Sequence, residues 1–116
     1  MASPVSIFDK IVSGAIPSSK VYEDDKVVAF KDVNPAAPVH VLLVPKNRVG
    51  LDRLSMAQDR LKDILGHMMV CVPKVARAVG LDDFRVVIND GPKAGQTVFH
   101  LHLHIIGGGN FTWPPT

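Results

Sequence analysis

The segment 99–106 constrains the fold more than any other, because apolar residues and histidine alternate along residues 99–105 without a break. His100, His102 and His104 are each separated by a single leucine. Side chains of a β-strand alternate between its two faces, so the pattern predicts a strand over residues 98–106 with all three histidines on one face. The apolar face of such a strand must be buried against another element, which requires a packed sheet.

The other segments predict an α+β fold with a mainly antiparallel sheet. Residues 6–12 have helical apolar spacing and are followed by Gly14, a typical helix stop. Runs of β-branched and aromatic residues predict four strands in addition to the histidine strand, at residues 21–23, 27–30, 40–44 and 84–89.

A long helix is predicted between these strands. Apolar residues recur at three- and four-residue steps through residues 61–79. Ser55 and Gln58 resemble a capping box, which would start the helix near Ser55, and Gly80 would end it. Pro73 lies within the run, where we expect a kink and one helix.

Length and composition limit the class of protein. A chain of 116 residues has room for one domain. Its net charge of +2 is too small for extended binding to a nucleic-acid duplex, whereas a small anionic ligand is compatible. We expect neither a signal peptide nor a membrane span. The single cysteine, Cys71, cannot form an intramolecular disulfide, which favours the reducing cytoplasm or the nucleus.

The histidine face predicts a chemical site, because imidazole is the side chain whose ordinary pKa lies nearest neutrality. One alternative is zinc ligation by histidines two residues apart on a strand. The other is phosphoryl or nucleotidyl transfer, in which neutral imidazole is the nucleophile and its cation a general acid. Residues 89–97 supply glycines, side-chain amides and a hydroxyl that suit phosphate oxygens, which favours the second alternative. We therefore expect no metal and no other cofactor.

These residues resemble the histidine triad (HIT) family, whose signature is His-φ-His-φ-His-φ-φ with φ apolar. Residues 100–106 match it completely. The chain is similar to the nucleotide-binding branch of that family over nearly its whole length. Further matching blocks occur in the expected order at residues 8–11, 23–25, 29–30, 35–40, 44–46, 95–98 and 113–115.

The resemblance implies a single HIT domain over residues 1–116, with a core at about residues 6–106 and a C-terminal tail at residues 107–116. Its expected fold is a five-stranded antiparallel sheet with two helices. In the family this domain forms a homodimer, in which the two sheets join into one of ten strands. Each half of the dimer would carry one site.

The resemblance also assigns roles to histidines. The middle histidine of the family attacks the α-phosphorus of a nucleotide, which makes His102 the expected nucleophile. His104 would contact the phosphate or the leaving group. His100 and His40 would orient the nucleophile and relay protons. His67 and Cys71, both on the predicted long helix, match nothing catalytic and are interpreted as structural.

The nucleotide itself would be held by residues that carry over from the family. The ribose hydroxyls would donate to Asp32. The predicted phosphate-binding residues are Asn89, Gly95, Gln96 and Thr97. The predicted base-binding residues are Ile7, Phe8, Ile11, Phe30 and Val33.

The activity implied by the resemblance is hydrolysis of adenosine 5′-monophosphoramidates and aminoacyl adenylates to AMP, through a covalent nucleotidyl-histidine. A sister branch cleaves dinucleoside polyphosphates, but the ending at residues 113–115 is typical of the phosphoramidase branch. Residues 109–111 and Thr116 depart from that branch. Trp113 is expected near the partner subunit's site, where it would shape the leaving-group pocket. The alternative from another class is a nucleotide-binding scaffold with incidental hydrolysis.

Overall fold

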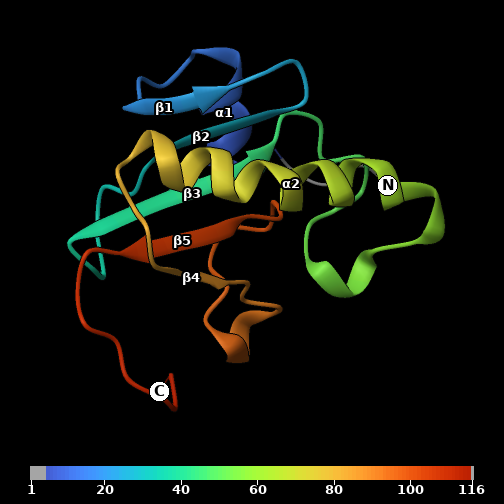
Figure 1. Ribbon diagram of the computed structural model, residues 1–116. Helices are drawn as coiled ribbons and strands as arrows, with labels where there is room; N and C mark the ends of the chain where they lie inside the picture. The colour runs from blue at the N-terminus through green and yellow to red at the C-terminus, as the bar shows by residue number, and fades with distance from the viewer. Residues whose placement is uncertain (1–4, 116) are drawn as a thin grey trace.

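An antiparallel sheet lies at the centre of the computed structural model, which describes residues 5–115 (Figure 1). Across those residues it has five strands, in the spatial order β1-β2-β3-β5-β4. The strands are β1 (Lys20–Glu23), β2 (Val27–Lys31), β3 (Val39–Pro45), β4 (Phe84–Val87) and β5 (Leu103–Gly107). The predicted α+β class with a five-stranded sheet is confirmed. Residues 1–4 and Thr116 of the predicted domain lie outside the described residues.

The short helix α1 (Ile7–Ser13) has both of the end signals that define a stable short helix. The Ser6 hydroxyl accepts from the Asp9 amide at 3.1 Å, and the Asp9 carboxylate accepts from the Ser6 amide at 2.8 Å. Gly14 then ends the helix with a φ of 82°, which favours glycine. The predicted first helix is confirmed.

The long helix α2 (Lys62–Ala78) begins later than the sequence predicts. The predicted capping box at Ser55 is wrong, because the segment before α2 forms two short 3-10 helices. The Ser55 amide instead donates to the carboxylate of Asp90 at 3.0 Å, and Gln58 accepts from Arg60. The helix continues as one element through Pro73, as expected.

The two faces of the sheet are covered by different helices (Figure 1). On the α2 face, residues such as Val41, Leu43 and Ile105 pack with Cys71 and the other buried residues of α2 into the larger core. On the α1 face, a smaller core joins α1 to β2 and β3; its members are Phe8, Ile11, Val28, Phe30, Leu42 and Val44. Alternate residues of one strand therefore belong to separate cores.

The predicted strand over residues 98–106 is wrong in its first half, because β5 begins at Leu103. Before that point the chain leaves the ladder, and the Leu101 amide donates to the carbonyl of Leu51 at 2.9 Å. The alternation survives: Leu101 and Leu103 lie in the α2-face core, while the histidines lie on the other side. Contacts with distant loops thus replace strand pairing without changing which side chains share a face.

None of the helices within residues 5–115 combines the length and the apolar character that a membrane span requires.

Candidate active site

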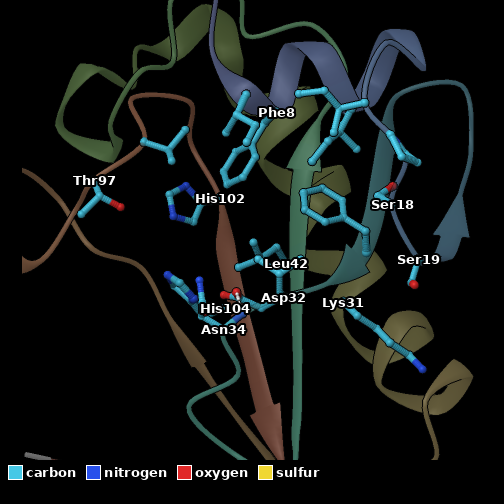
Figure 2. Close-up of a pocket in the computed structure, with 17 residues that line it drawn as sticks. Phe8, Ser18, Ser19, Lys31, Asp32, Asn34, Leu42, Thr97, His102 and His104 are labelled. Carbon is cyan, nitrogen blue, oxygen red and sulfur yellow. Dashed lines mark hydrogen bonds between the residues drawn. The ribbon is translucent and has the colours of Figure 1, made fainter.

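A pocket of about 730 Å³ lies on the α1 face, between α1 and residues of β2, β3 and β5 (Figure 2). This volume is within the roughly 300–1,000 Å³ that is common for small-molecule sites. The predicted site residues that line it are Ile7, Phe8, Ile11, Phe30, Asp32, Val33, Thr97, His102 and His104. The predicted site residues outside its lining are His40, His100, Asn89, Gly95, Gln96 and Trp113.

His102 is held in one tautomer. Its Nδ1 lies 2.7 Å from the backbone carbonyl oxygen of His100. A carbonyl can only accept, so Nδ1 carries the proton and Nε2 keeps its lone pair. The Phe8 ring packs edge-on against this imidazole, with ring centroids 5.0 Å apart (Figure 2). The result is a fixed imidazole in the pocket lining with an unprotonated ring nitrogen.

His104 is held in the opposite tautomer by a chain that starts at the backbone. The Ala36 amide donates to Nδ1 of His40 at 2.9 Å, so the proton of neutral His40 is on Nε2. That Nε2 lies 2.9 Å from Nδ1 of His104, which accepts from it. The proton of neutral His104 is therefore on Nε2. The pocket thus combines one imidazole acceptor, on His102, with one imidazole donor, on His104.

Burial keeps the three triad histidines uncharged near neutral pH. Desolvation is the largest cause that lowers the pKa of His104, and together with the neighbouring rings of His102 and His40 it brings this pKa to about 4. Burial also lowers the pKa of His102, although the His100 carbonyl and the Asp32 carboxylate oppose it. Burial lowers the pKa of His100 in the same way. A neutral His102 can act as a nucleophile at physiological pH.

His100 does not line the pocket; it connects α1 to the histidine segment. Its ring is fully buried, and Nε2 donates to the Pro45 carbonyl at 2.8 Å. Its Nδ1 accepts from the hydroxyl of Ser6, the residue that caps α1, at 3.0 Å. Arg48 strengthens this connection by contacting the Asp9 carboxylate at 3.1 Å and donating to the Phe99 carbonyl at 3.1 Å. Sequence reasoning missed Ser6 and Arg48. The capping-box spacing of Ser6 and Asp9 was the available signal for Ser6.

Gln96 supports the loop that precedes the histidines. Its side-chain oxygen accepts from the Gly91 amide, and its side-chain nitrogen donates to the carbonyls of Asp52 and Val98. With both amide hydrogens used, Gln96 shapes the loop that carries Thr97 into the pocket. The loop also depends on Gly91, whose φ of 96° strains any other residue, and a side chain there would also displace the Arg53 guanidinium.

The remaining predicted loop residues are also engaged within the loop. Asn89 donates from its side chain to the Ala94 carbonyl at 2.8 Å. The Gly95 amide donates to the Pro92 carbonyl. Asp32, in contrast, lies in the pocket, with one carboxylate oxygen accepting from the Asn34 amide at 2.9 Å.

Sequence reasoning also missed Ser18. It lines the pocket, and its buried hydroxyl has no hydrogen-bond partner among residues 5–115. No motif predicted it, because its position depends on how the segment after α1 folds back over the sheet.

The fold and the site together define an α+β domain with one imidazole that has a free ring nitrogen and one that has a protonated ring nitrogen at the same pocket. The HIT domain family matches residues 13–111 of the chain. The chain therefore belongs to the HIT family, and the resemblance inferred from the sequence is confirmed.

Individual relatives support this membership. A 14 kDa zinc-binding protein from Brassica juncea is 54% identical over 111 residues, covering 95% of this chain and 98% of the relative. Adenylylsulfatase HINT1 from Arabidopsis thaliana is also 54% identical, covering 95% of this chain and 76% of the relative. Among solved structures, a histidine triad protein from Clostridium difficile has 46% identity and a TM-score of 0.87, with 97% of each chain covered. A HIT family hydrolase from Legionella pneumophila Philadelphia 1 has 38% identity and a TM-score of 0.88, covering 95% of this chain and 98% of that one.

Proposed function

We propose that this protein hydrolyses purine nucleoside 5′-phosphoramidates and aminoacyl adenylates, releasing AMP through a nucleotidyl-histidine intermediate. The observation that carries the proposal is the fixed tautomer of His102, whose Nδ1 donates to the His100 carbonyl and leaves Nε2 unprotonated. The names of the relatives agree with it, since one is an adenylylsulfatase and one a HIT family hydrolase. An adenylyl group joined to a leaving group is the substrate class that the name of the Arabidopsis relative describes, and we propose the same class for this pocket.

In the first step, Nε2 of His102 attacks the α-phosphorus, and the bond between phosphorus and the leaving nitrogen breaks. The leaving amine needs a proton, which Nε2 of His104 would supply from the imidazolium form that the anionic phosphate of a bound substrate favours. Nε2 of His40, 2.9 Å from Nδ1 of His104, would hold the ring in place during this transfer. In the second step, water attacks the phosphorus and gives a proton back to His104, the bond between phosphorus and Nε2 of His102 breaks, and AMP leaves.

Substrate positions follow from the pocket walls. The base would lie among Phe8, Ile11 and Phe30, and the ribose beside Asp32. The phosphate would meet Thr97 and the histidines. We further propose the homodimer with a ten-stranded sheet, for which the edge strands β1 and β4 of the single-chain sheet are available. Trp113, whose side chain is 84% exposed, would then reach the partner subunit's site.

The name of the Brassica relative raises the question of zinc in this pocket. Asp32, His40 and His104 do bring one oxygen and two nitrogens within 4.8 Å of one another. A neutral imidazole that binds metal through Nε2 must keep its proton on Nδ1. In His40 that Nδ1 already accepts from the Ala36 amide, so the group does not fit a metal as it stands. No step of the proposed hydrolysis uses a metal.

The test is turnover of adenosine 5′-phosphoramidate, adenylyl sulfate and diadenosine tetraphosphate by the purified full chain. We expect fastest release of AMP from the phosphoramidate, and no change after exhaustive chelation. His67→Ala is the matched control, since it removes a histidine that lies outside the pocket lining. Fastest turnover of the dinucleotide would reassign the substrate, and nucleotide binding without turnover would favour the scaffold alternative.

A further inference from the structure

A second cluster of metal-ligating side chains lies on the α2 face, away from the pocket. His67 and Cys71 are four residues apart, so they share one side of α2. Asp24, in the turn between β1 and β2, meets them there. Its Oδ2 lies 2.8 Å from His67 Nε2 and 3.7 Å from Cys71 Sγ, and that sulfur lies 3.5 Å from His67 Nε2.

The Asp24 carboxylate is fixed in place before any ligand binds. Its Oδ1 accepts from the amides of Lys26 and Val27, each at 2.8 Å, which leaves Oδ2 facing the helix. Burial raises the pKa of this carboxyl, but the two amides and His67 outweigh that effect and hold it below its usual range. The Tyr22 hydroxyl also donates to Oδ2 at 3.1 Å. The ionised Oδ2 of Asp24 therefore faces the Cys71 thiol and the His67 imidazole.

The spacing of the three donor atoms suits a tetrahedral metal. With bond lengths of about 2.0–2.3 Å, the donor atoms of tetrahedral zinc lie about 3.4–3.6 Å apart. The two distances from Cys71 Sγ, 3.5 and 3.7 Å, are close to this range. The distance of 2.8 Å between His67 and Asp24 is that of a hydrogen bond, and it must lengthen by a small side-chain rotation when a metal replaces the proton.

The protonation states are also compatible, in contrast to those of His40. His67 donates from Nε2 to Asp24 in the free chain, and when a metal takes that position Nδ1 can take up the proton that a neutral metal-bound imidazole requires. Burial raises the pKa of the Cys71 thiol, so the metal must displace that proton on binding. Cys71 is fully buried, whereas the His67 and Asp24 side chains are 27% and 22% exposed and provide a path inward.

We propose that Asp24, His67 and Cys71 form a second site that binds a zinc-type divalent cation. Thiolate and imidazole together select zinc or cobalt over magnesium and calcium, which prefer oxygen ligands. Three protein ligands leave a fourth position for water. The bound ion would join α2 to the β1–β2 turn and stabilise the larger core. This inference does not depend on nucleotide hydrolysis.

Cobalt(II) is the direct probe, because a thiolate ligand produces a charge-transfer absorption band in the near ultraviolet. Chelator-treated full chain is titrated with Co²⁺ and then with Zn²⁺. We expect one cobalt per chain with this band, displacement by zinc, and a higher melting temperature with zinc. Cys71→Ala should abolish the band, and His67→Asn should weaken binding more than about 100-fold, beyond the effect typical of outer partners of a metal site.

The matched control is His104→Asn, which removes a histidine of the other candidate group and should leave the cobalt band intact. His67→Asn changes a partly exposed residue, so it gives a result even if Cys71→Ala unfolds. The proposal is overturned if the wild-type chain shows no thiolate band, if the band survives in Cys71→Ala, or if His104→Asn abolishes it. In those cases the three residues are only a buried polar network that holds α2 to the turn.

Discussion

The two faces of the sheet are built from the same strands but differ in how completely they are covered. The α2 face lies under a helix of 17 residues, and its core residues are almost entirely inaccessible. The α1 face lies under a helix of 7 residues, which covers β2 and β3 only in part and leaves the pocket. The larger core therefore lies on the α2 face and the candidate active site on the α1 face. Adjacent residues of β3 therefore have different surroundings, because Leu43 packs in the larger core and Leu42 lines the pocket.

The largest effect is expected at His102. His102→Ala should lower single-turnover hydrolysis of an adenosine phosphoramidate by about 1,000-fold or more, because it removes the attacking nitrogen. AMP affinity should change little, because the ring supplies little of the ligand contact surface, whereas the free energy of unfolding should fall by about 1–3 kcal/mol, because the ring is buried and packs against Phe8. Rapid-quench kinetics, AMP titration and urea denaturation measure the three quantities. A near-normal rate would remove His102 from its role.

The division between the faces can be tested within β3. Leu43→Ala should destabilise the chain by about 2–5 kcal/mol, because the side chain is fully buried in the larger core. Leu42→Ala, one residue away, lines the pocket and should destabilise less while raising KM. Urea denaturation of both variants, with KM measured alongside, makes the comparison. Equal losses of stability would contradict the division.

Acid should destabilise the chain through the α1 face. The pKa of His104 is lowered from 6.5 to about 4 in the folded chain, so the unfolded chain binds more protons between these values. The free energy of unfolding should therefore fall as pH drops from 6.5 toward 4. Denaturation curves at pH 7 and 5 measure the loss, which should be smaller in His104→Asn. An identical loss in that variant would place the titrating group elsewhere.

The tail should affect substrate choice more than binding. Deleting the residues after Gly109 should change the ratio of phosphoramidate to dinucleoside polyphosphate turnover, because only the leaving-group side is altered. AMP affinity should stay nearly constant. Comparing full-length and truncated protein at the same oligomeric state isolates the effect. An unchanged ratio would give residues 110–116 a structural role only.

The smallest effect is expected at Ser18. Its buried hydroxyl has no partner among the described residues, so Ser18→Ala should leave the unfolding free energy within about 0.5 kcal/mol of wild type, or raise it slightly. Thermal denaturation without nucleotide measures this. A clear loss of stability would show that the hydroxyl has a partner in solution.

Sequence patterns predicted most helices and strands, because the formation of these elements depends largely on residues that are close in the sequence. The alternation of histidine and leucine assigned two faces, and the runs at β1, β2 and β3 placed three strands. The start of β5 was predicted incorrectly because the Leu101 amide donates to the Leu51 carbonyl, a contact between distant segments. The start of α2 was missed for a similar reason, since Ser55 binds Asp90 across the fold.

The candidate site was predictable as a set of residue types, but its internal order was not. Three histidines in alternation indicated the chemistry. Which nitrogen of His102 is free depends on the His100 carbonyl, and the state of His104 depends on Ala36 through His40. Spacing along the chain contains no information on such contacts. The same holds for Arg48, which joins α1 to the segment before His100.

The contact between Ser6 and His100 also has a consequence for folding. These residues are 94 positions apart, so a loop of almost the whole chain must close before α1 and the histidine segment can form the pocket together. Contacts of such high sequence separation form slowly compared with helices and hairpins. During refolding, we therefore expect helical content to recover before nucleotide binding. We expect the pocket to be the last part of the domain to be completed, because its walls come from α1 and the histidine segment, which are far apart in the sequence.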